Sequence, residues 1–342
     1  MKAQFGRALP GNLAECVISS EARNLLMHGR RRISPFGRND RSCIKLPFAI
    51  ALFVVVTFLS VIWTPAVLCA TYKDALDREV VIPEPPKRII PLAPSLTEIL
   101  YRLGLGDRVV GVTNHCNYPP DAASKPKVGS YINLNVEQIV SLAPDLVIGT
   151  VDGNERAVVE ILEKTGIPIY LVNPRNVWEA VLTLALLGKL CGVEQAAKAL
   201  AAELTGRVDQ VVLMTASREK PLVFLQINLQ PIMTVNSRTM HHDLIRLAGG
   251  RNMTAEEPIT YPRISMEEII RRQPDIILIS SMERGGRFEK AREEWLKWTS
   301  IPAVKTGRVH LIDSDLIDRP SPRVVEGLEI MAKLIHPGIE WR

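Results

Sequence analysis

Two tyrosine–glutamate pairs stand out because the chain repeats them with the same spacing. Tyr131 precedes Glu137 by six residues, and Tyr261 precedes Glu267 by the same six. Aromatic faces with a hydroxyl group suit a large flat ligand with an apolar rim. Two equivalent surface carboxylates suit a dimeric partner with two basic sockets. We therefore predict that the tyrosines line a binding cleft and that the glutamates dock a partner.

Each pair also has a purely local interpretation. A tyrosine ring can pack over the start of its own helix, and a glutamate in a first helical turn is stabilised by the macrodipole by a few tenths of a kcal/mol. The local interpretation does not explain why the glutamate recurs when its neighbour, Gln138 or Glu268, already serves the free amides. We therefore favour docking for Glu137 and Glu267.

The repeat extends into the elements that would position these residues. In both copies a Pro-Asp pair follows the glutamate by seven residues, and an apolar run follows the pair at once. The pairs are Pro144-Asp145 and Pro274-Asp275, and the runs cover residues 146–148 and 276–279. Asn135 and Ser265 stand where each helix would need a cap. Each copy therefore predicts a loop, a capped helix, a tight turn and a buried strand of a parallel sheet.

Two such copies predict an α/β fold with two similar lobes. We expect a basic leader, an N-terminal α/β lobe, connecting helices and a C-terminal α/β lobe, covering residues 1–70, 71–176, 177–218 and 219–342. From about residue 193 to 217 the chain holds almost no helix breakers, so it predicts one helix on the order of 35 Å long. The lobes would then be joined by a stiff element rather than by a flexible linker.

Two further spacings predict helix starts. Ser95 and Glu98 have the spacing of a capping box, in which the two side chains satisfy the first free amides reciprocally. Ser321-Pro322 predicts the start of the closing helix, with proline at the first helical position.

The charge distribution argues against nucleic acid as a partner. The formal net charge is +5, but residues 1–70 hold nine lysines and arginines against three acidic residues. The remainder of the chain is therefore slightly acidic, and no basic footprint remains in its folded part.

The leader has the order of a secretory signal. Residues 46–68 carry no charge, a basic segment precedes them, and Cys69-Ala70 comes before a polar stretch. The chain is therefore expected in the periplasm or elsewhere outside the cytoplasm. The run 46–68 is also long enough to stay as an anchor, so removal, a retained anchor and lipidation at Cys69 all stay open. A disulfide between Cys116 and Cys191 is permitted there but cannot be deduced.

Three further residues lie where open α/β sheets bind ligands, beyond the carboxyl ends of predicted strands. His115 follows a strand at 109–112, and it is either an axial ligand to iron or cobalt in a bound macrocycle or an ordinary polar loop residue. Asp315 and Arg319 follow the last strand, and we expect them to contact polar groups of a ligand. The sequence shows no clustered acid–base pair, so we predict no catalytic residues and no enzyme activity.

The chain from about residue 74 to its end resembles the substrate-binding proteins of ABC importers that have a helical backbone. This class takes up cobalamin, ferric siderophores and haem, and the likeness is greatest to its periplasmic cobalamin-binding members. The stretches that carry the resemblance are residues 88–98, 117–120, 137–148, 249–252 and 261–265. They are specific for the superfamily and much less so for the ligand.

The resemblance implies two Rossmann-like lobes, a long backbone helix that permits limited closure, and a ligand held in the cleft. It also implies that one glutamate in each lobe, matched here by Glu137 and Glu267, engages arginines of an ABC permease dimer that works with ATPase subunits. Proteins of this class carry no intrinsic cofactor and perform no chemistry on the ligand. We expect a monomer.

For the cargo, the positions that match the cleft residues of the class are His115, Tyr131 and Tyr261, with Asp315 and Arg319 on the last loop. Cobalamin or a related corrinoid is the leading expectation. Haem or a ferric siderophore is the alternative within the class, because tyrosine and histidine stand where cobalamin binders have larger or different aromatics. From another class, a chelatase-like tetrapyrrole enzyme is the alternative.

Overall fold

The computed structural model describes residues 69–130, 132–280 and 287–340, and all of them belong to one compact unit that spans 66–342. Among these residues no helix combines the length and the apolar character that crossing a membrane requires.

Several sequence predictions fall outside the described residues. These are the leader, apart from Cys69 and Ala70, its apolar run 46–68, and Tyr131.

The N-terminal lobe is built on a parallel sheet with the strand order β3-β4-β5. Its strands are β3 (Ile89–Pro91), β4 (Leu146–Thr150) and β5 (Ile169–Val172), and its main helices are α2 (Pro94–Arg102), α4 (Val136–Ser141) and α5 (Arg156–Lys164). A hairpin of β1 (Cys69–Lys73) and β2 (Glu79–Pro83) precedes the sheet, and η1 (Gly106–Arg108) and α3 (Pro120–Ala123) lie between α2 and α4. The strands are apolar on both faces because helices cover both faces.

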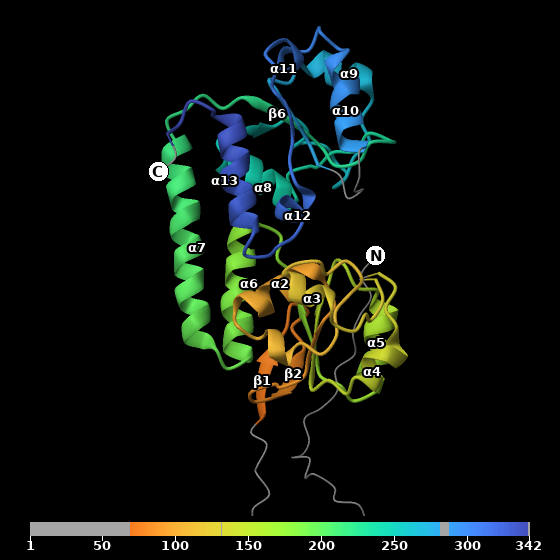
Figure 1. The fold of residues 1–342 in the computed structure, drawn as a ribbon. Helices are drawn as coiled ribbons and strands as arrows, with labels where there is room; N and C mark the ends of the chain where they lie inside the picture. Colours follow the sequence, from red (N-terminus) through yellow and green to blue (C-terminus); the bar gives the residue numbers. More distant parts are fainter. Residues whose placement is uncertain (1–68, 131, 281–286, 341–342) are drawn as a thin grey trace, which may run out of the picture. The chain divides into compact units, whose positions relative to one another are not determined.

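The C-terminal lobe has a parallel sheet with the order β7-β6-β8-β9. The strands are β6 (Leu222–Gln226), β7 (Arg251–Asn252), β8 (Ile276–Ile279) and β9 (Val309–Leu311). The helices are α8 (Met240–Leu247), α9 (Met266–Arg272), α10 (Arg287–Leu296), α11 (Pro302–Lys305), α12 (Ser314–Ile317) and α13 (Val324–Ile335). The predicted α/β architecture of two lobes is confirmed (Figure 1).

The two copies of the repeat fold as predicted, into α4 with β4 and into α9 with β8. Asn135 caps α4 by accepting a hydrogen bond from the backbone N–H of Gln138 at 2.9 Å. Ser265 caps α9 in the same way, accepting from the N–H of Glu268 at 3.2 Å. The two segments with equal spacing in the sequence therefore have the same local structure, a capped helix followed by a buried strand.

The Pro-Asp pairs have a role that the spacing alone did not reveal. The Asp145 carboxylate accepts hydrogen bonds from the backbone N–H groups of Lys87 and Arg88 at 2.7 and 2.9 Å. The Asp275 carboxylate accepts one from Leu222 at 2.7 Å. In each lobe the aspartate thus satisfies free amides at the start of the neighbouring parallel strand.

The turn before each Pro-Asp pair also repeats, in a left-handed backbone conformation. Ala143 has φ 44° and Gln273 has φ 51°. Proline disfavours the right-handed helical region for the residue before it, so α4 and α9 both end by reversing the sign of φ there. A side chain in that region costs roughly 1–2 kcal/mol relative to glycine.

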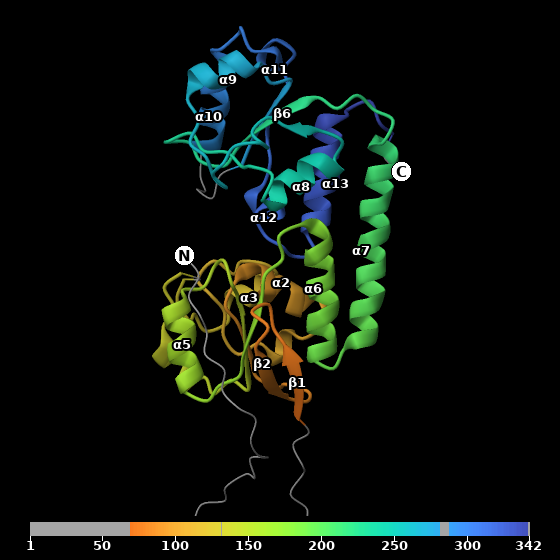
Figure 2. The same ribbon diagram turned by 180° about the vertical axis from the view of Figure 1, so that it is seen from behind.

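Two helices connect the lobes, α6 (Val177–Leu190) and α7 (Glu194–Thr215). The Asn176 side chain caps α6 by accepting from the N–H of Glu179 at 2.9 Å. Helix α7 has 22 residues, which corresponds to about 33 Å. It packs against α6 beside the N-terminal lobe and against α13 in the C-terminal lobe, as both views show (Figures 1 and 2).

One apolar core runs through both lobes. It joins inward side chains of both sheets, such as Ile148 and Leu225, through buried residues of the connecting helices, such as Leu184 and Val208. The other face of each sheet has its own smaller core, under α4 and α5 in one lobe and under α9, α10 and α11 in the other. Separating the lobes would therefore expose apolar surface to water, which costs about 25 cal/mol of free energy for each Å² exposed.

Three sequence predictions of local structure are wrong. No strand forms at 109–112, where a strand was expected. Val109 and Val112 each form one isolated β-bridge, with Ile89 and Lys127 respectively. Helix α2 begins at Pro94 without a side-chain cap, and Glu98 is buried rather than closing a capping box. The closing helix begins at Val324, after a turn that contains Ser321.

The cysteines left open by the sequence are unbonded. Cys116 and Cys191 are both buried and free. Burial raises the pKa of the Cys191 thiol to about 12, so it stays protonated at neutral pH.

The left-handed turn generates a stability prediction. Ala143→Gly is expected to raise the free energy of unfolding by about 1 kcal/mol or less, because relief of the strain exceeds the entropy that glycine adds to the unfolded chain. Ala143→Val should lower it, since a β-branched residue tolerates positive φ poorly. Urea denaturation of the three proteins measures both effects. Equal stability of the glycine and valine variants would contradict the proposed strain.

Candidate functional site

A cavity of about 700 Å³ lies between the two lobes. Its N-terminal wall comes from the segments 93–95, 150–153 and 173–175, which lie at the ends of β3, β4 and β5, and from the loop 114–117. Its C-terminal wall comes from residues 238–241, Tyr261 and the segment 314–320 around α12. This position, beyond the carboxyl ends of parallel strands, is the one predicted from the sheets.

Most of the side chains on the wall are polar or charged. Amides and hydroxyls such as Asn114, Thr150 and Asn173 lie beside the charged side chains, whereas Met240 is one of its few large apolar side chains. Among the described residues, Tyr261 is the one aromatic on the wall, with 48% of its surface exposed. These polar groups can orient a ligand by hydrogen bonds.

Two exposed arginines reach the cavity from opposite lobes. In the N-terminal lobe Arg175 forms an ion pair with Asp152 at 2.7 Å, and about half of each side chain is exposed. In the C-terminal lobe Arg238 donates to the carbonyl of Pro258. Exposed guanidinium groups bind carboxylates and phosphates, so both ends of the cavity can receive an anionic group. Sequence reasoning missed these residues because no motif surrounds them.

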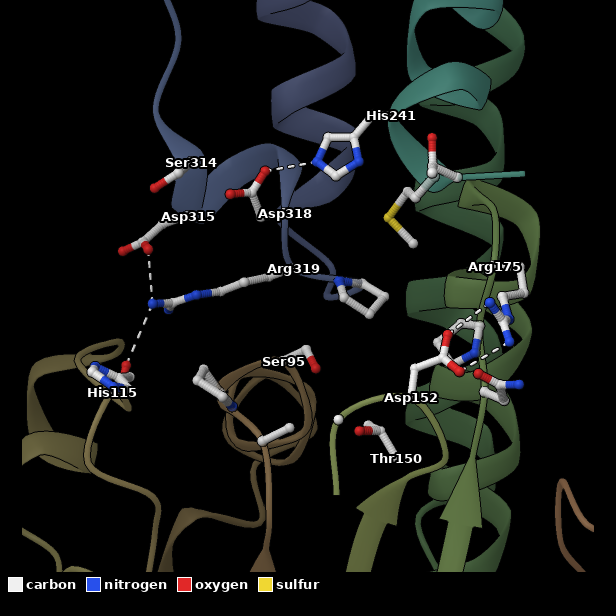
Figure 3. A pocket seen from close by; sticks show the side chains of 18 of the residues that line it. Ser95, His115, Thr150, Asp152, Arg175, His241, Ser314, Asp315, Asp318 and Arg319 are labelled. Carbon is white, nitrogen blue, oxygen red and sulfur yellow. Dashed lines mark hydrogen bonds and ion pairs between the residues drawn. The ribbon is translucent and has the colours of Figure 1, made fainter. Parts of the chain in front are cut away.

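A histidine that the sequence did not assign to the site lies in the roof of the cavity (Figure 3). The Nε2 atom of His241 is 2.7 Å from a carboxylate oxygen of Asp318. His241 is 9% exposed, and its Nδ1 atom has no partner in the described part of the chain. The sequence clue was its place at the start of a helix that follows the first strand of the second lobe.

Four of the five predicted ligand-binding residues come together on the cavity wall. These are His115, Tyr261, Asp315 and Arg319. The fifth, Tyr131, lies outside the described residues. His115 is exposed, and its imidazole makes no hydrogen bond or ion pair within the described part of the chain. Its ring is therefore accessible to a ligand.

Arg319 has protein partners that the sequence did not predict. Its guanidinium forms ion pairs with Asp315 and with Glu98, each at 2.7 Å. It therefore bridges the two lobes at the cavity wall, and any contact with a ligand would come in addition to these ion pairs.

The repeated glutamates lie away from the cavity. Glu137 and Glu267 are exposed residues in the first turns of α4 and α9, and neither lines the wall. Figure 1 shows these helices at opposite ends of the described unit, both on the side away from α7. The pKa of the Glu267 carboxyl is lowered by hydrogen bonds from its own backbone N–H and from Ser265, so it is ionised at neutral pH.

Two α/β lobes with a cavity between them and a long helix behind them define a binding protein with a helical backbone. The family model described as "Periplasmic binding protein" matches residues 89–316, and the chain belongs to this family. The family confirms the predicted class, the substrate-binding proteins of ABC importers, and a location outside the cytoplasm.

Known relatives share most of the chain. An uncharacterized ABC transporter substrate-binding lipoprotein of Bacillus subtilis is 33% identical over 275 residues, which cover 78% of this chain and 85% of the relative. A vitamin B12-binding protein of Vibrio campbellii is 31% identical over 247 residues, which cover 71% of this chain and 87% of the relative.

Solved structures agree with this fold. The periplasmic vitamin B12 binding protein of Vibrio cholerae matches with a TM-score of 0.67 and 28% identity, over 74% of this chain and 98% of that chain. A periplasmic haem-binding protein of Pseudomonas aeruginosa matches with a TM-score of 0.68 and 25% identity, over 75% of this chain and 94% of that chain.

The first turn of α9 generates a pH prediction. Glu268 is paired with Arg271 and Arg272, which lower the pKa of its carboxyl to about 2. Because this folded-state pKa is depressed, the stability it contributes is present above pH 4.5 and is lost as pH falls toward 2. Carboxyl carbon chemical shifts should show Glu268 titrating near pH 2. Arg271→Ala with Arg272→Ala should return the pKa toward 4.5, and an unchanged titration would show that the arginines are not its cause.

Proposed function

We propose that the protein is the exported substrate-binding component of an ABC importer, which captures cobalamin or a related corrinoid between its lobes and delivers it to the permease. The observation that carries this proposal is the cavity of about 700 Å³ that is lined by residues of both lobes. The vitamin B12-binding relatives support the choice of cargo.

The polar side chains on the wall favour a corrinoid over haem. A corrin ring is fringed with amide groups, which suit the amides and hydroxyls of Asn114, Asn117, Thr150 and Asn173. Haem has a mostly apolar rim and needs apolar surface around it. The exposed Arg175 and Arg238 would suit a phosphate, but also haem propionates or siderophore carboxylates. Haem or a ferric siderophore is therefore the second candidate, and the haem-binding structural relative supports it.

His115 is proposed as the contact to the metal of the cargo. It is exposed on the wall, and its ring is not engaged by the described part of the chain. An imidazole in this state can ligate cobalt or iron held in a macrocycle. Tyr261 and Tyr131 are proposed to contact the flat faces of the ring, with Asp315 and Arg319 on its polar edge.

The proposed organisation keeps the boundaries of the sequence prediction. Residues 71–176 and 219–342 are the two lobes, 177–218 connects them, and 1–70 is the export leader. Cys69 is the first residue of β1 and pairs with Pro83, so a lipid attached there would lie directly beside the hairpin.

Glu137 and Glu267 are proposed to dock a permease dimer that works with ATPase subunits, and the protein is proposed to act as a monomer. Their exposure and equivalent helical positions support this role. The protein would hold its cargo without chemical change and without an intrinsic cofactor. The competing proposal, a chelatase-like enzyme, would require metal insertion into a tetrapyrrole with turnover.

Binding is tested by titrating the purified protein with cyanocobalamin. We expect saturable binding with a Kd of about 1 µM or lower, roughly −8 kcal/mol. His115→Ala should shift the absorption bands of the bound cargo, whereas His310→Ala should not, because His310 lies on β9 outside the cavity wall. Saturable binding of haem or a ferric siderophore instead of cyanocobalamin would overturn the corrinoid assignment but keep the class.

Docking is tested by reversing both charges, Glu137→Lys with Glu267→Lys. Uptake of cargo into cells should be abolished while the affinity of the purified protein for cargo is unchanged, because both residues lie outside the cavity wall. The control reverses two other exposed glutamates, Glu160 on α5 and Glu293 on α10, and should transport normally. Loss of cargo affinity in the first variant would assign the glutamates to the pocket.

A further inference from the structure

A buried glutamate lies behind the cavity wall and connects the two lobes. Glu98, on α2 of the N-terminal lobe, is 3% exposed and does not line the cavity. One carboxylate oxygen accepts from the guanidinium of Arg319 at 2.7 Å, and the other accepts from the hydroxyl of Ser321 at 2.6 Å. Both donors belong to the C-terminal lobe, so the carboxylate joins elements more than 200 residues apart in the chain.

The Arg319 guanidinium is held on its other side as well. It pairs with Asp315 at 2.7 Å, and both side chains are 11% exposed. Asn117 of the N-terminal lobe completes the contact, accepting from Arg319 at 2.9 Å and donating to Asp315 at 3.0 Å. Figure 3 shows Arg319 reaching across the cleft between Asp315 in one lobe and His115 in the other.

A second arginine balances the charge of this cluster. Arg323 lies 3.4 Å from the same Glu98 oxygen, and its guanidinium stacks over the ring of Tyr118 at 4.2 Å. Two carboxylates, Glu98 and Asp315, thus face two guanidinium groups. We name Glu98, Asn117, Asp315, Arg319, Ser321 and Arg323 the lobe bridge.

We propose that Glu98 is a positioning residue that fixes Arg319 and Asp315 in the cavity wall and thereby sets the separation of the lobes before cargo arrives. The connecting helices and the shared apolar core join the lobes on one side of the molecule, and attachment on one side alone would leave an opening rotation free. The lobe bridge attaches them a second time, where the α12 region meets α2 (Figure 1). Two attachments define one cavity width.

The chemistry of the lobe bridge suits positioning better than stabilisation. A buried ion pair brings little net stability, because desolvation of both charges offsets their attraction. Its hydrogen bonds nevertheless require one geometry, since each oxygen and each guanidinium has a specific partner. A cavity of fixed width would bind its cargo with less loss of conformational entropy. This inference holds whichever cargo the cavity takes.

The distance between the lobes can be measured without any ligand. Spin labels at Glu160→Cys on α5 and Glu293→Cys on α10 report it by double electron–electron resonance, in a background where Cys16, Cys43 and Cys69 are replaced by serine. Cys116 and Cys191 are buried and should not react. The parent protein should give one narrow distance distribution.

Glu98→Gln keeps the shape of the side chain and removes its charge. We expect part of the distribution to shift to longer distances. The matched control is Glu329→Gln, which breaks another partly buried ion pair, with Arg207, that joins α7 to α13 and does not bridge the cleft. The control should keep the parent distribution.

If Glu98→Gln does not fold, Glu98→Leu with Arg319→Met decides the question, because an apolar replacement of a buried ion pair usually preserves stability. Its distribution should also broaden. A parent-like distribution in the folded variant, even with a lower Tm, would show that the cluster only stabilises the fold. An equal shift in Glu329→Gln would overturn the proposal too, since the effect would then not be specific to Glu98.

Discussion

The structure depends on one apolar core that both lobes share. Side chains from both sheets belong to one buried cluster with residues of α6, α7, α8 and α13, so the core on that side is continuous between the lobes. Large separation would expose this surface to water. The segments that follow the strands of both sheets are consequently held on the two sides of the cavity.

Apolar and polar contacts have separate roles in this protein. The shared core sets which elements lie together, but apolar packing is non-directional and does not by itself fix the width of a cleft. The directional contacts lie at the cleft, where Arg319 joins Glu98 and Asp315. The polar and charged side chains on the cavity wall can recognise cargo by hydrogen bonds and charge, and Asp315 and Arg319 belong both to this wall and to the lobe bridge.

The sequence predicted what depends on local signals. The repeat was visible because the caps Asn135 and Ser265 and the Pro-Asp turns act within a few residues of each other. The role of Glu98 was mistaken because its spacing from Ser95 matches a capping box, while its true partners lie in the other lobe. Contacts between distant segments leave no spacing to detect, and Arg175, Arg238 and His241 were missed for the same reason. The roles of Tyr261, His115, Glu137 and Glu267 remain predictions.

The most direct test is a crystal structure of the protein grown with cyanocobalamin. Density for the corrinoid should lie between the lobes, with Tyr261 against the ring and His115 facing the cobalt, and the contacts of Arg319 to Glu98 and Asp315 should be unchanged. Density at another surface, or crystals grown with saturating cyanocobalamin in which the cleft holds only water, would contradict the assignment of this cavity as the cargo site.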